Sequence, residues 1–460
     1  MSARKVLVAG AGVSGRGVVA LLDGLGWQIS VADRDVDAAA EVAALPGATV
    51  LSLGEAEERV SGFDLVVTSP GWRPNSPLLV AASRCGVEVI GDVELAYRLD
   101  QQGVFGAART WLAVTGTNGK TTTTGMLASI MQASGAAAQP VGNIGVAVTD
   151  ALRNQPRIDV LVAELSSFQL HWAPTFRPDA GVLLNLADDH LDWHGGFDDY
   201  AASKYRVLRG PVAIVGADDA RVKALVADRD DVIGFTLGEP GPGQVGVIGD
   251  RIVSRVGNNS VELAGIEGIE PAGPVGVLDA LAAAAMAHSQ NVRPADIEAG
   301  LQSFRVQGHR GQMVAHTKRL RWIDNSKATN PHAAATALAG IDRAVWIAGG
   351  QLKGATVDDL IHEVAPRLAG AVLLGVDRQE IADAFRRQAP DVPVRVIDSQ
   401  DPWDAMEQAC RAAAELAPDG ATVALAPAAA SLDMYRGMAH RGEIFSQCAR
   451  KLSEGSEGEA

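Results

Sequence analysis

Short apolar runs alternate with helix-like segments in three successive blocks of the chain, and this alternation restricts the fold more than any other feature. Parallel strands read as short runs of apolar residues, and each needs a helical crossover to reach the next. The pattern therefore predicts an α/β fold with a parallel sheet in each block. The expected strands are 6–9, 29–32, 65–68 and 87–90 in the first block, 111–115, 160–163, 182–184 and 212–215 in the second, and 320–323, 345–348, 371–376, 394–397 and 422–426 in the third.

The length of 460 residues also favours several domains, since single hydrophobic cores rarely grow so large. The segment 101–109 breaks the alternation and is typical of a linker. Residues 234–276 suggest short antiparallel strands, and the alanine-rich stretch 278–287 suggests a buried helix. The tail, rich in Gly, Ser and Glu, is expected to be disordered. The expected domains are 1–105, 106–305 and 306–452, followed by the tail 453–460.

Composition excludes several classes of function. The net charge is −15 and no Lys/Arg-rich run is present, which argues against a nucleic-acid partner. No run of about 18 apolar residues occurs, so we expect no membrane span. The N-terminus lacks a signal-peptide core, and the three cysteines are widely spaced, as reduced thiols would be. We expect a cytoplasmic protein that acts as a monomer.

The strongest single motif is the glycine-rich run Gly116-Thr117-Asn118-Gly119-Lys120-Thr121-Thr122. It lies between an apolar strand and a helix-like segment, so its backbone N–H groups can hold an anion at a helix start. Lys120 can reach the phosphates of a nucleotide, and the Thr121 hydroxyl can bind Mg²⁺. A strict Walker A motif would need glycine at position 114, where this chain has Val114. The alternative is a glycine-rich turn without a ligand.

A second glycine run, Gly10-Ala11-Gly12-Val13-Ser14-Gly15, follows the first strand, and Asp33 ends the next one. This spacing fits the dinucleotide fingerprint. The motif requires only a phosphate-bearing ligand at a helix start, and a UDP-sugar meets that requirement as well as NAD does. The alternative is tight packing without a ligand.

Possible metal ligands follow two strands of the second block. Glu164 ends one strand, and the acidic run that includes His190 follows the strand that ends near Asn185. Hard oxygens with an imidazole could hold Mg²⁺ near phosphates, although such runs are more often solvated loops. From the pattern alone, His194 and Lys204 read as surface residues.

In the third block, three polar loops follow predicted strands: 324–331, 349–354 and 426–431. His309 and Arg310 precede another strand. Turns favour Gly, Asn and Ser in any case, so each loop alone is weak evidence. Their joint position at the carboxyl ends of strands indicates a ligand site.

Taken together, these residues resemble the Mur ligase family over essentially the whole chain. The loop Gly116–Thr122 matches the ATP loop of the family, which replaces the strict Walker A. The run Asp324–Asn330, with its Lys327 and Ala328, is similar to the signature of the member that adds D-glutamate. Supporting matches are Ser69-Pro70-Gly71, Gly142-Asn143-Ile144-Gly145 and Ser431-Leu432-Asp433.

The resemblance implies a Rossmann-like N-terminal domain, a central P-loop-type ATPase domain and a Rossmann-like C-terminal domain. It further implies a ligase that adds D-glutamate to UDP-N-acetylmuramoyl-L-alanine through an acyl phosphate, using ATP and two Mg²⁺ sites. Carbamylation of Lys204, which the resemblance implies, requires a neutral amine. The implied catalytic residues are Lys120, His190, Lys204 and Arg310, and the metal ligands Thr121, Glu164, His190 and Lys204. For ATP they are Gly116, Thr117, Asn118, Gly119, Lys120, Thr121, Thr122, Arg310, Asp324, Asn325 and Lys327. For the UDP-substrate they are Ser14, Gly15, Asp33, Arg34, Ser69, Pro70, Gly71 and Asn143, and for D-glutamate Thr329, Lys353 and Ser431.

The chain departs from the family pattern in two places. Asn325 stands where the signature usually has Asp, which alters the charge of that contact. Gly276 and Asp279 replace asparagines that in the family often contact adenine. The resemblance thus implies that adenine recognition here depends more on backbone groups, or that ATP binds more weakly.

Three other functions remain open at this point. An NAD-dependent oxidoreductase would explain the run Gly10–Gly15 but would leave the loop Gly116–Thr122 without a role. A non-catalytic ATP-binding regulator would bind nucleotide without releasing phosphate. Another Mur ligase would add a different amino acid.

Overall fold

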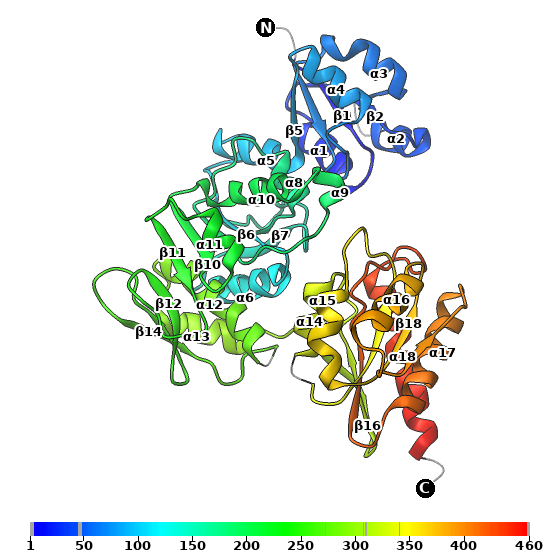
Figure 1. Ribbon diagram of the computed structural model, residues 1–460. Helices are drawn as coiled ribbons and strands as arrows, with labels where there is room; N and C mark the ends of the chain where they lie inside the picture. The colour runs from blue at the N-terminus through cyan, green and yellow to red at the C-terminus, as the bar shows by residue number, and fades with distance from the viewer. Residues whose placement is uncertain are drawn as a thin grey trace. The chain divides into compact units, whose positions relative to one another are not determined.

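The computed structural model describes residues 4–44, 48–271, 273–306, 308, 311–339 and 341–457. The chain divides into two compact units. The first unit comprises Met1–Leu186 and Trp193–Phe304, and the second comprises Ala187–Asp192 and Arg305–Ala460. Three sheets, two in the first unit and one in the second, confirm the predicted α/β fold (Figure 1). The longer segment of the second unit begins at Arg305, and position 105 lies inside the first unit.

The N-terminal sheet has five parallel strands in the order β3-β2-β1-β4-β5. Four of them were expected. The fifth, β3, has only one buried residue, so it gives no apolar run in the sequence. The strands are β1 (Lys5–Ala9), β2 (Gln28–Ala32), β3 (Ala48–Leu51), β4 (Leu65–Thr68) and β5 (Glu88–Gly91), and the helices are α1 (Val13–Leu22), α2 (Val36–Ala43), α3 (Leu53–Arg59), η1 (Val60–Gly62), α4 (Pro77–Arg84) and α5 (Asp92–Gln101).

The central sheet has nine strands in the order β14-β13-β12-β11-β10-β9-β6-β8-β7. Strands β12, β13 and β14 form the antiparallel extension that the composition of 234–276 predicted, although β12 itself runs parallel to β11. The strands are β6 (Thr110–Thr115), β7 (Ala138–Gly142), β8 (Val160–Glu164), β9 (Ala180–Leu183), β10 (Val212–Gly216), β11 (Val232–Phe235), β12 (Gln244–Ile248), β13 (Arg251–Ser254) and β14 (Val261–Gly265). The helices of this region are α6 (Lys120–Ala133), α7 (Val148–Ala151), α8 (Ser167–His171), α9 (Leu191–His194), α10 (Phe197–Tyr205), η2 (Arg206–Arg209), α11 (Ala220–Leu225), α12 (Pro274–Ser289) and α13 (Pro294–Ser303).

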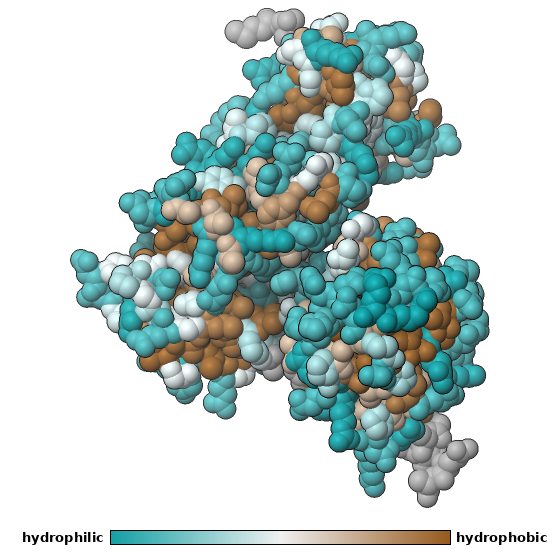
Figure 2. Space-filling model, viewed as in Figure 1, coloured by the Kyte–Doolittle hydropathy of each residue, from teal (hydrophilic) through white to brown (hydrophobic). Residues whose placement is uncertain are grey.

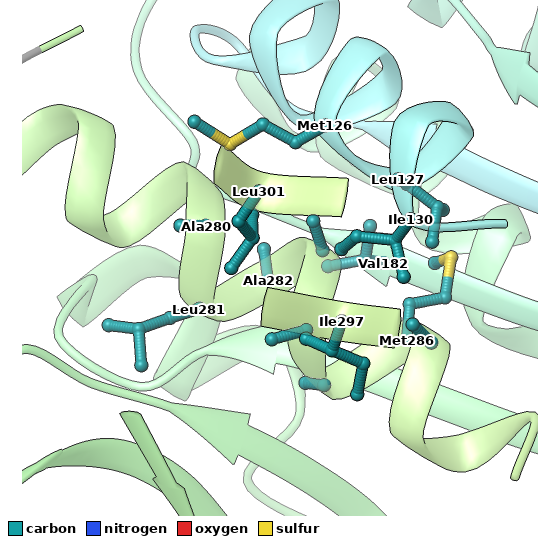
Figure 3. Packing of buried hydrophobic residues seen from close by; sticks show 14 of the residues in the cluster. Met126, Leu127, Ile130, Val182, Ala280, Leu281, Ala282, Met286, Ile297 and Leu301 are labelled. Carbon is teal, nitrogen blue, oxygen red and sulfur yellow. The ribbon is translucent and has the colours of Figure 1, made fainter. Parts of the chain in front are cut away.

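The core beside this sheet is built from α6, α12 and α13. Residues 280–287 of α12 are almost fully buried, so the alanine-rich stretch is a core helix as expected. Its small side chains, together with Gly300 of α13, let the helices approach closely; a Cβ on Gly300 would collide with the backbone of Ile130. Figure 3 shows Met126, Leu127 and Ile130 of α6 among side chains of α12 and α13. This packing fixes the helix that starts at the glycine loop.

A buried ion pair ties the two sheets of the first unit together. Arg109 Nη1 donates to Asp100 Oδ1 at 2.6 Å, and Trp111 Nε1 donates to the other oxygen of Asp100 at 2.9 Å. At a second junction, the Gly91 N–H donates to the Trp172 carbonyl at 2.7 Å. The segment 101–109, expected to be a linker, therefore ends in a fixed contact.

The sheet of the second unit has six strands in the order β15-β16-β20-β17-β18-β19, of which only β15 is antiparallel to its neighbour. Residues Ser453–Glu457, expected to be disordered, form the end of a helix; residues 458–460 lie outside the described part. The strands are β15 (Gln312–His316), β16 (Leu320–Asp324), β17 (Ala344–Gly349), β18 (Leu368–Leu374), β19 (Val394–Val396) and β20 (Ala421–Leu425). The helices are α14 (Pro331–Leu338), α15 (Asp358–Val364), η3 (Ala365–Arg367), α16 (Arg378–Gln388), α17 (Pro402–Leu416) and α18 (Met438–Glu457).

The surface is mixed in character. Figure 2 shows hydrophilic residues interspersed with apolar ones across the visible face. In the described ranges, no helix is both long and apolar enough to cross a membrane. The three cysteines are all free thiols, in agreement with the expectation.

Candidate active site

The loop between β6 and α6 is held in shape by residues from neighbouring strands and helices. Gly119 adopts a left-handed conformation with φ = +83° and caps the 14-residue helix α6. A Cβ at this position would collide with the Asp279 carboxylate, so both backbone and space require glycine. Asn185, two residues after the end of β9, accepts from Asn118 N at 2.9 Å with its side chain and from Thr117 N at 3.0 Å with its carbonyl. The start of α6, where N–H groups and the helix dipole favour an anion, is thereby fixed.

Two lysines converge on one carbonyl of this loop. Lys120 Nζ donates to the carbonyls of Gly116 at 2.9 Å and Thr117 at 2.8 Å. Lys204 Nζ donates to the same Gly116 carbonyl at 2.7 Å and to Thr115 Oγ1 at 3.3 Å. Two ammonium groups within hydrogen-bond reach of one oxygen make this place strongly attractive to phosphate.

The structure corrects the reading of Lys204 as a surface residue. Its relative exposure is only 2%, and Nζ lies 4.9 Å from the centre of the Tyr200 ring. The Tyr200 hydroxyl in turn forms a hydrogen bond of 2.7 Å with Thr117 Oγ1. Helix α10 thus presents Tyr200 and Lys204, one turn apart, to the glycine loop.

Glu164 has the features of a metal ligand. It ends β8, next to β6, and is 1% exposed. Its Oε1 accepts from Asn143 Nδ2 at 2.8 Å, whereas its buried Oε2 has no hydrogen-bond partner among the described residues. A buried carboxylate oxygen without a partner is costly unless a cation completes it, so this side chain fits Mg²⁺.

The other expected metal ligands are less fully characterised. Thr121 is the second residue of α6 and is half-buried. His190 has φ = +54° and lies 3.6 Å from Asp189 Oδ1, in the segment Ala187–Asp192 that belongs to the second unit. Within the described ranges, no three His, Cys, Asp or Glu side chains form a cluster that could hold a metal. A Mg²⁺ ion whose ligands include phosphate oxygens would not require such a cluster.

His194 is also not a surface residue, contrary to the reading of the pattern. It is buried and stacks on Phe168 with the ring planes 8° apart. Its Nε2 forms a hydrogen bond of 2.9 Å with Ser167 Oγ. His194 therefore serves the packing of α8 against α9 and α10.

In the N-terminal sheet, the glycine run is braced by Asp33. Its Oδ2 accepts from Ala11 N at 2.7 Å, and its Oδ1 accepts from Asp35 N at 3.0 Å. Gly10 and Gly15 serve close packing, because a Cβ on either would collide with Ser69 or with the Gly10 carbonyl. A Cβ on Gly12, by contrast, would meet nothing within 4 Å. The run thus combines tight packing with an open helix start.

The remaining residues expected around the UDP-substrate differ in their surroundings. Ser14 is half-buried; burial raises the pKa of the neighbouring Asp92 carboxyl, and the Ser14 hydroxyl partly offsets this rise. Ser69 Oγ is buried and has no partner among the described residues. Pro70 is half-buried, whereas Arg34, Gly71 and Asn143 are exposed, and the Gly71 carbonyl accepts from Trp193 Nε1 at 3.4 Å.

In the second unit, the three predicted loops meet at the carboxyl ends of the adjacent strands β16, β20 and β17. The loop after β20 is bonded to both others: Ala428 N donates to the Ala328 carbonyl at 2.9 Å, and Ala430 N to the Gln351 carbonyl at 2.9 Å. The sequence prediction that these loops share one edge is confirmed.

Arg441 of α18 holds these three loops together. It is 1% exposed, and its guanidinium donates to Ser326, Gly349 and Ala429 over distances of 2.9–3.2 Å. Burial lowers the pKa of Arg441 to about 10, so it remains charged at neutral pH. The sequence analysis missed this residue, since an arginine in an amphipathic helix gives no signal of burial.

The residues expected to bind nucleotide and D-glutamate lie on these loops. Asp324 is fully buried and accepts from Ser326 N at 2.8 Å, so its visible role is to shape the loop. Asn325 Oδ1 accepts from Gly311 N at 2.6 Å. Lys327 and Thr329 are half-buried, Ser431 is buried, and Lys353 is exposed with φ = +54°. Lys353 makes no hydrogen bond or ion pair to another described residue. Arg310, with His309, lies outside the described residues.

The two departures near 276–279 have a structural reason. A Cβ on Gly276 would collide with the Pro271 carbonyl, so this backbone excludes a side chain there. Asp279 is buried and accepts from Thr123 Oγ1 at 3.0 Å. The sequence analysis missed this bracing role, together with the roles of Asn185 and Tyr200. The position of Asn185 directly after a predicted strand was the one available signal.

Comparison with known proteins identifies the chain's relatives. Three family models match: "Mur ligase MurD-like, N-terminal domain" over residues 4–91, "Mur ligase middle domain" over 114–242 and "Mur ligase, glutamate ligase domain" over 309–429. A UDP-N-acetylmuramoylalanine–D-glutamate ligase of Corynebacterium efficiens is 54% identical over 455 residues, which cover 98% of this chain and 96% of that protein. The enzyme of the same name from Corynebacterium diphtheriae is 54% identical over 451 residues, 96% and 95% of the two chains.

Among solved structures, a pseudomurein peptide ligase type C from Methanothermus fervidus matches with a TM-score of 0.59. The two chains are 17% identical, and the match covers 96% of this chain and 99% of the other. At this identity the likeness supports the fold alone.

Proposed function

This chain belongs to the Mur ligase family, and from that premise we propose that it joins D-glutamate to UDP-N-acetylmuramoyl-L-alanine with conversion of ATP to ADP and phosphate. The observation that carries the proposal is the identity of 54% to a ligase of that name over 98% of the chain. The convergence of Lys120 and Lys204 on the glycine loop supports it from the structure. The reaction belongs to the synthesis of the peptidoglycan precursor.

The chemistry overcomes the low reactivity of a carboxylate. An oxygen of the substrate carboxylate attacks the γ-phosphorus of ATP, the bond to the bridging oxygen breaks, and ADP leaves. The amine of D-glutamate then attacks the acyl carbon, loses a proton, and phosphate leaves with the former carboxylate oxygen. Charge that spreads over the transferred phosphoryl group is the main barrier that the protein must offset.

The chain's own groups at the glycine loop fit this task. The N–H groups at the start of α6 would hold the phosphates, and Lys120 Nζ would move from the carbonyls of Gly116 and Thr117 to phosphate oxygens. Asn185 and Asp279 would keep the loop in position during this exchange. Thr117, Asn118 and Thr122 complete the proposed ATP contacts from this unit.

We propose that Mg²⁺ is bound by Thr121, Glu164, His190 and a carbamylated Lys204. Bound Mg²⁺ would neutralise phosphate charge in two sites. Carbamylation would convert the buried amine of Lys204 into an anion suited to a cation, and the pocket formed by Thr115, Gly116 and Tyr200 would hold it in place. The unpartnered oxygen of Glu164 supports the assignment.

The substrates are assigned to the remaining loops. Ser14, Gly15, Asp33, Arg34 and the run Ser69–Gly71 would line the UDP site, with Asn143 at the sugar-peptide. Thr329, Lys353 and Ser431 would hold the carboxylates of D-glutamate; Lys353, which is exposed and makes no ion pair with a described residue, supports this role. Asp324, Asn325, Lys327 and Arg310 are proposed contacts of the nucleotide. We further propose that the protein works in the cytoplasm as a monomer, without nucleic-acid partners.

Phosphate release with UDP-N-acetylmuramoyl-L-alanine, ATP and a panel of D- and L-amino acids tests the proposal. We expect D-glutamate to give the highest kcat/KM. Faster release with another amino acid would assign the chain to a different reaction of the family. Nucleotide binding without phosphate release for any amino acid would favour the regulator, and tight nicotinamide binding would favour the oxidoreductase.

A further inference from the structure

A solvent-open cavity of about 500 Å³ lies in the first unit, away from the proposed ligase site. Arg177 and Gly210, which line it, come within three residues of the starts of β9 and β10. Because β6, β9 and β10 run parallel, this is the edge of the sheet opposite the glycine loop. A cavity of this size is large enough for a small organic ligand.

The lining is strongly basic for a chain with a net charge of −15. Three arginines, Arg177, Arg209 and Arg229, line the cavity together with a single acidic residue, Asp231. Asp231 is committed to Arg229, since both of its oxygens accept from that guanidinium at 2.7 Å. Arg177 and Arg209 form no ion pair with any residue that the structure describes.

The arginines are also held in place by backbone carbonyls. Arg177 Nε donates to the Arg209 carbonyl at 3.1 Å, and Arg209 Nη1 donates to the Pro174 carbonyl at 2.7 Å. Each contact occupies one of five N–H donors, so most donors of both guanidiniums stay available. A site with positioned donors loses less conformational entropy on binding.

A further arginine lies close to this lining. Arg206 donates to the carbonyls of Leu170 and His171 and makes no ion pair with a described residue. Its pKa is lowered, first by burial and then by the positive charge of Arg209. The positive charges here repel one another, and a bound anion would relieve that repulsion.

We propose that this cavity is a second ligand site, which binds a compact polyanion with two or more phosphate or carboxylate groups. Arg177 and Arg209 would each form charge-assisted hydrogen bonds to it, and Arg229, fixed by Asp231, would add to the field. Tyr205 and Leu208 supply the apolar part of the wall. Capping of backbone carbonyls alone would not require so many arginines around one open cavity.

Calorimetric titration of the full-length protein with inorganic pyrophosphate and, separately, with citrate tests the proposal without Mg²⁺. The variants are the wild type, the double variant Arg177→Ala/Arg209→Ala and the control Arg293→Ala, which removes an exposed arginine of the same unit. The glycine loop is unchanged in all of them, so binding there is a common background. We expect at least one probe to bind about 10-fold more weakly to the double variant, with the control unchanged.

The choice of probe distinguishes phosphate from carboxylate ligands. Charge should dominate the contact, so Arg209→Lys should retain more affinity than Arg209→Ala. Coincident titrations of wild type and double variant for both probes would overturn the proposal. An equal loss of affinity in Arg293→Ala would overturn it as well, because the effect would then follow net charge and not the cavity.

Discussion

The glycine loops of the first unit and the loop cluster of the second are held by opposite means. In the first unit each loop has its own brace: Asp33 for the N-terminal loop, and Asn185 with Asp279 for the central one. In the second unit a single guanidinium, Arg441, binds three loops at once. With separate braces, one loop can lose its function while the fold persists. When Arg441 acts as a shared clamp on three loops, its loss affects both function and the stability of the sheet end where β16, β17 and β20 terminate.

The largest expected effect is the loss of activity without loss of fold in Lys120→Ala. Removing the ammonium group takes away a charge-assisted contact to the transferred phosphoryl group. We expect ligation to fall by roughly 10³-fold, as for other preorganised donors, while UDP-substrate binding survives. Phosphate release and the urea midpoint would be compared with those of Lys223→Ala, an exposed lysine of the same unit. Normal turnover by Lys120→Ala would show that the phosphates are bound elsewhere.

Arg441→Ala should remove stability and activity together. It breaks several buried hydrogen bonds and leaves carbonyls of three loops unsatisfied, which should cost roughly 3–4 kcal/mol of unfolding free energy. Urea denaturation measures this value, with Arg450→Ala, exposed on the same helix, as the control. If Arg441→Ala kept the wild-type unfolding free energy, the shared clamp would not exist.

Gly119→Ala tests the brace of the central loop. Alanine at φ = +83° is strained, and its Cβ would also collide with Asp279. The matched control is Gly135→Ala, at φ = +87° with nothing within 4 Å, which carries the backbone strain alone. We expect Gly119→Ala to lose about 1–2 kcal/mol more than the control, with a raised KM for ATP. Equal losses would mean that Asp279 does not constrain the loop.

The effect that is smallest at neutral pH concerns stability in acid. The pKa of His171 in the first unit is lowered from 6.5 to about 4, first by burial and then by the charge of Arg206. Between these two values the unfolded chain binds the extra proton, so the stability due to His171 is full above pH 6.5 and is lost as the pH falls towards 4. In His171→Gln the urea midpoint should change less with pH over this range than in the wild type. The control His316→Gln, which replaces an exposed histidine of the second unit, should keep the wild-type pH dependence. If the urea midpoint of His171→Gln fell with pH as steeply as that of the wild type, other groups would cause the acid sensitivity.

Much of the fold followed from the sequence because buried parallel strands give continuous apolar runs. Besides β3, two further strands that were missed give none: β7 contains Pro140 and ends in Gly142 at the sheet edge, and β15 is a half-exposed edge strand. The loops at the carboxyl ends of β16, β17 and β20 were predicted from position alone.

The supporting residues of the site were harder to predict. Charged side chains are usually exposed, so neither Arg441 nor, from the pattern, Lys204 could be recognised as buried. Asp279 and Asn185 act on a loop distant from them in sequence, and only the packing of α12 and β9 brings them to it.

The Gly116 carbonyl, shared by Lys120 and Lys204, has a consequence for how nucleotide enters. The Lys120 ammonium group is already drawn out of water onto the carbonyls of Gly116 and Thr117, so an arriving phosphate would substitute one acceptor for another. Such a swap conserves the number of hydrogen bonds and avoids stripping water from free cations. Discrimination would then rest on the difference between a neutral dipole and a full negative charge, which favours the most highly charged nucleotide.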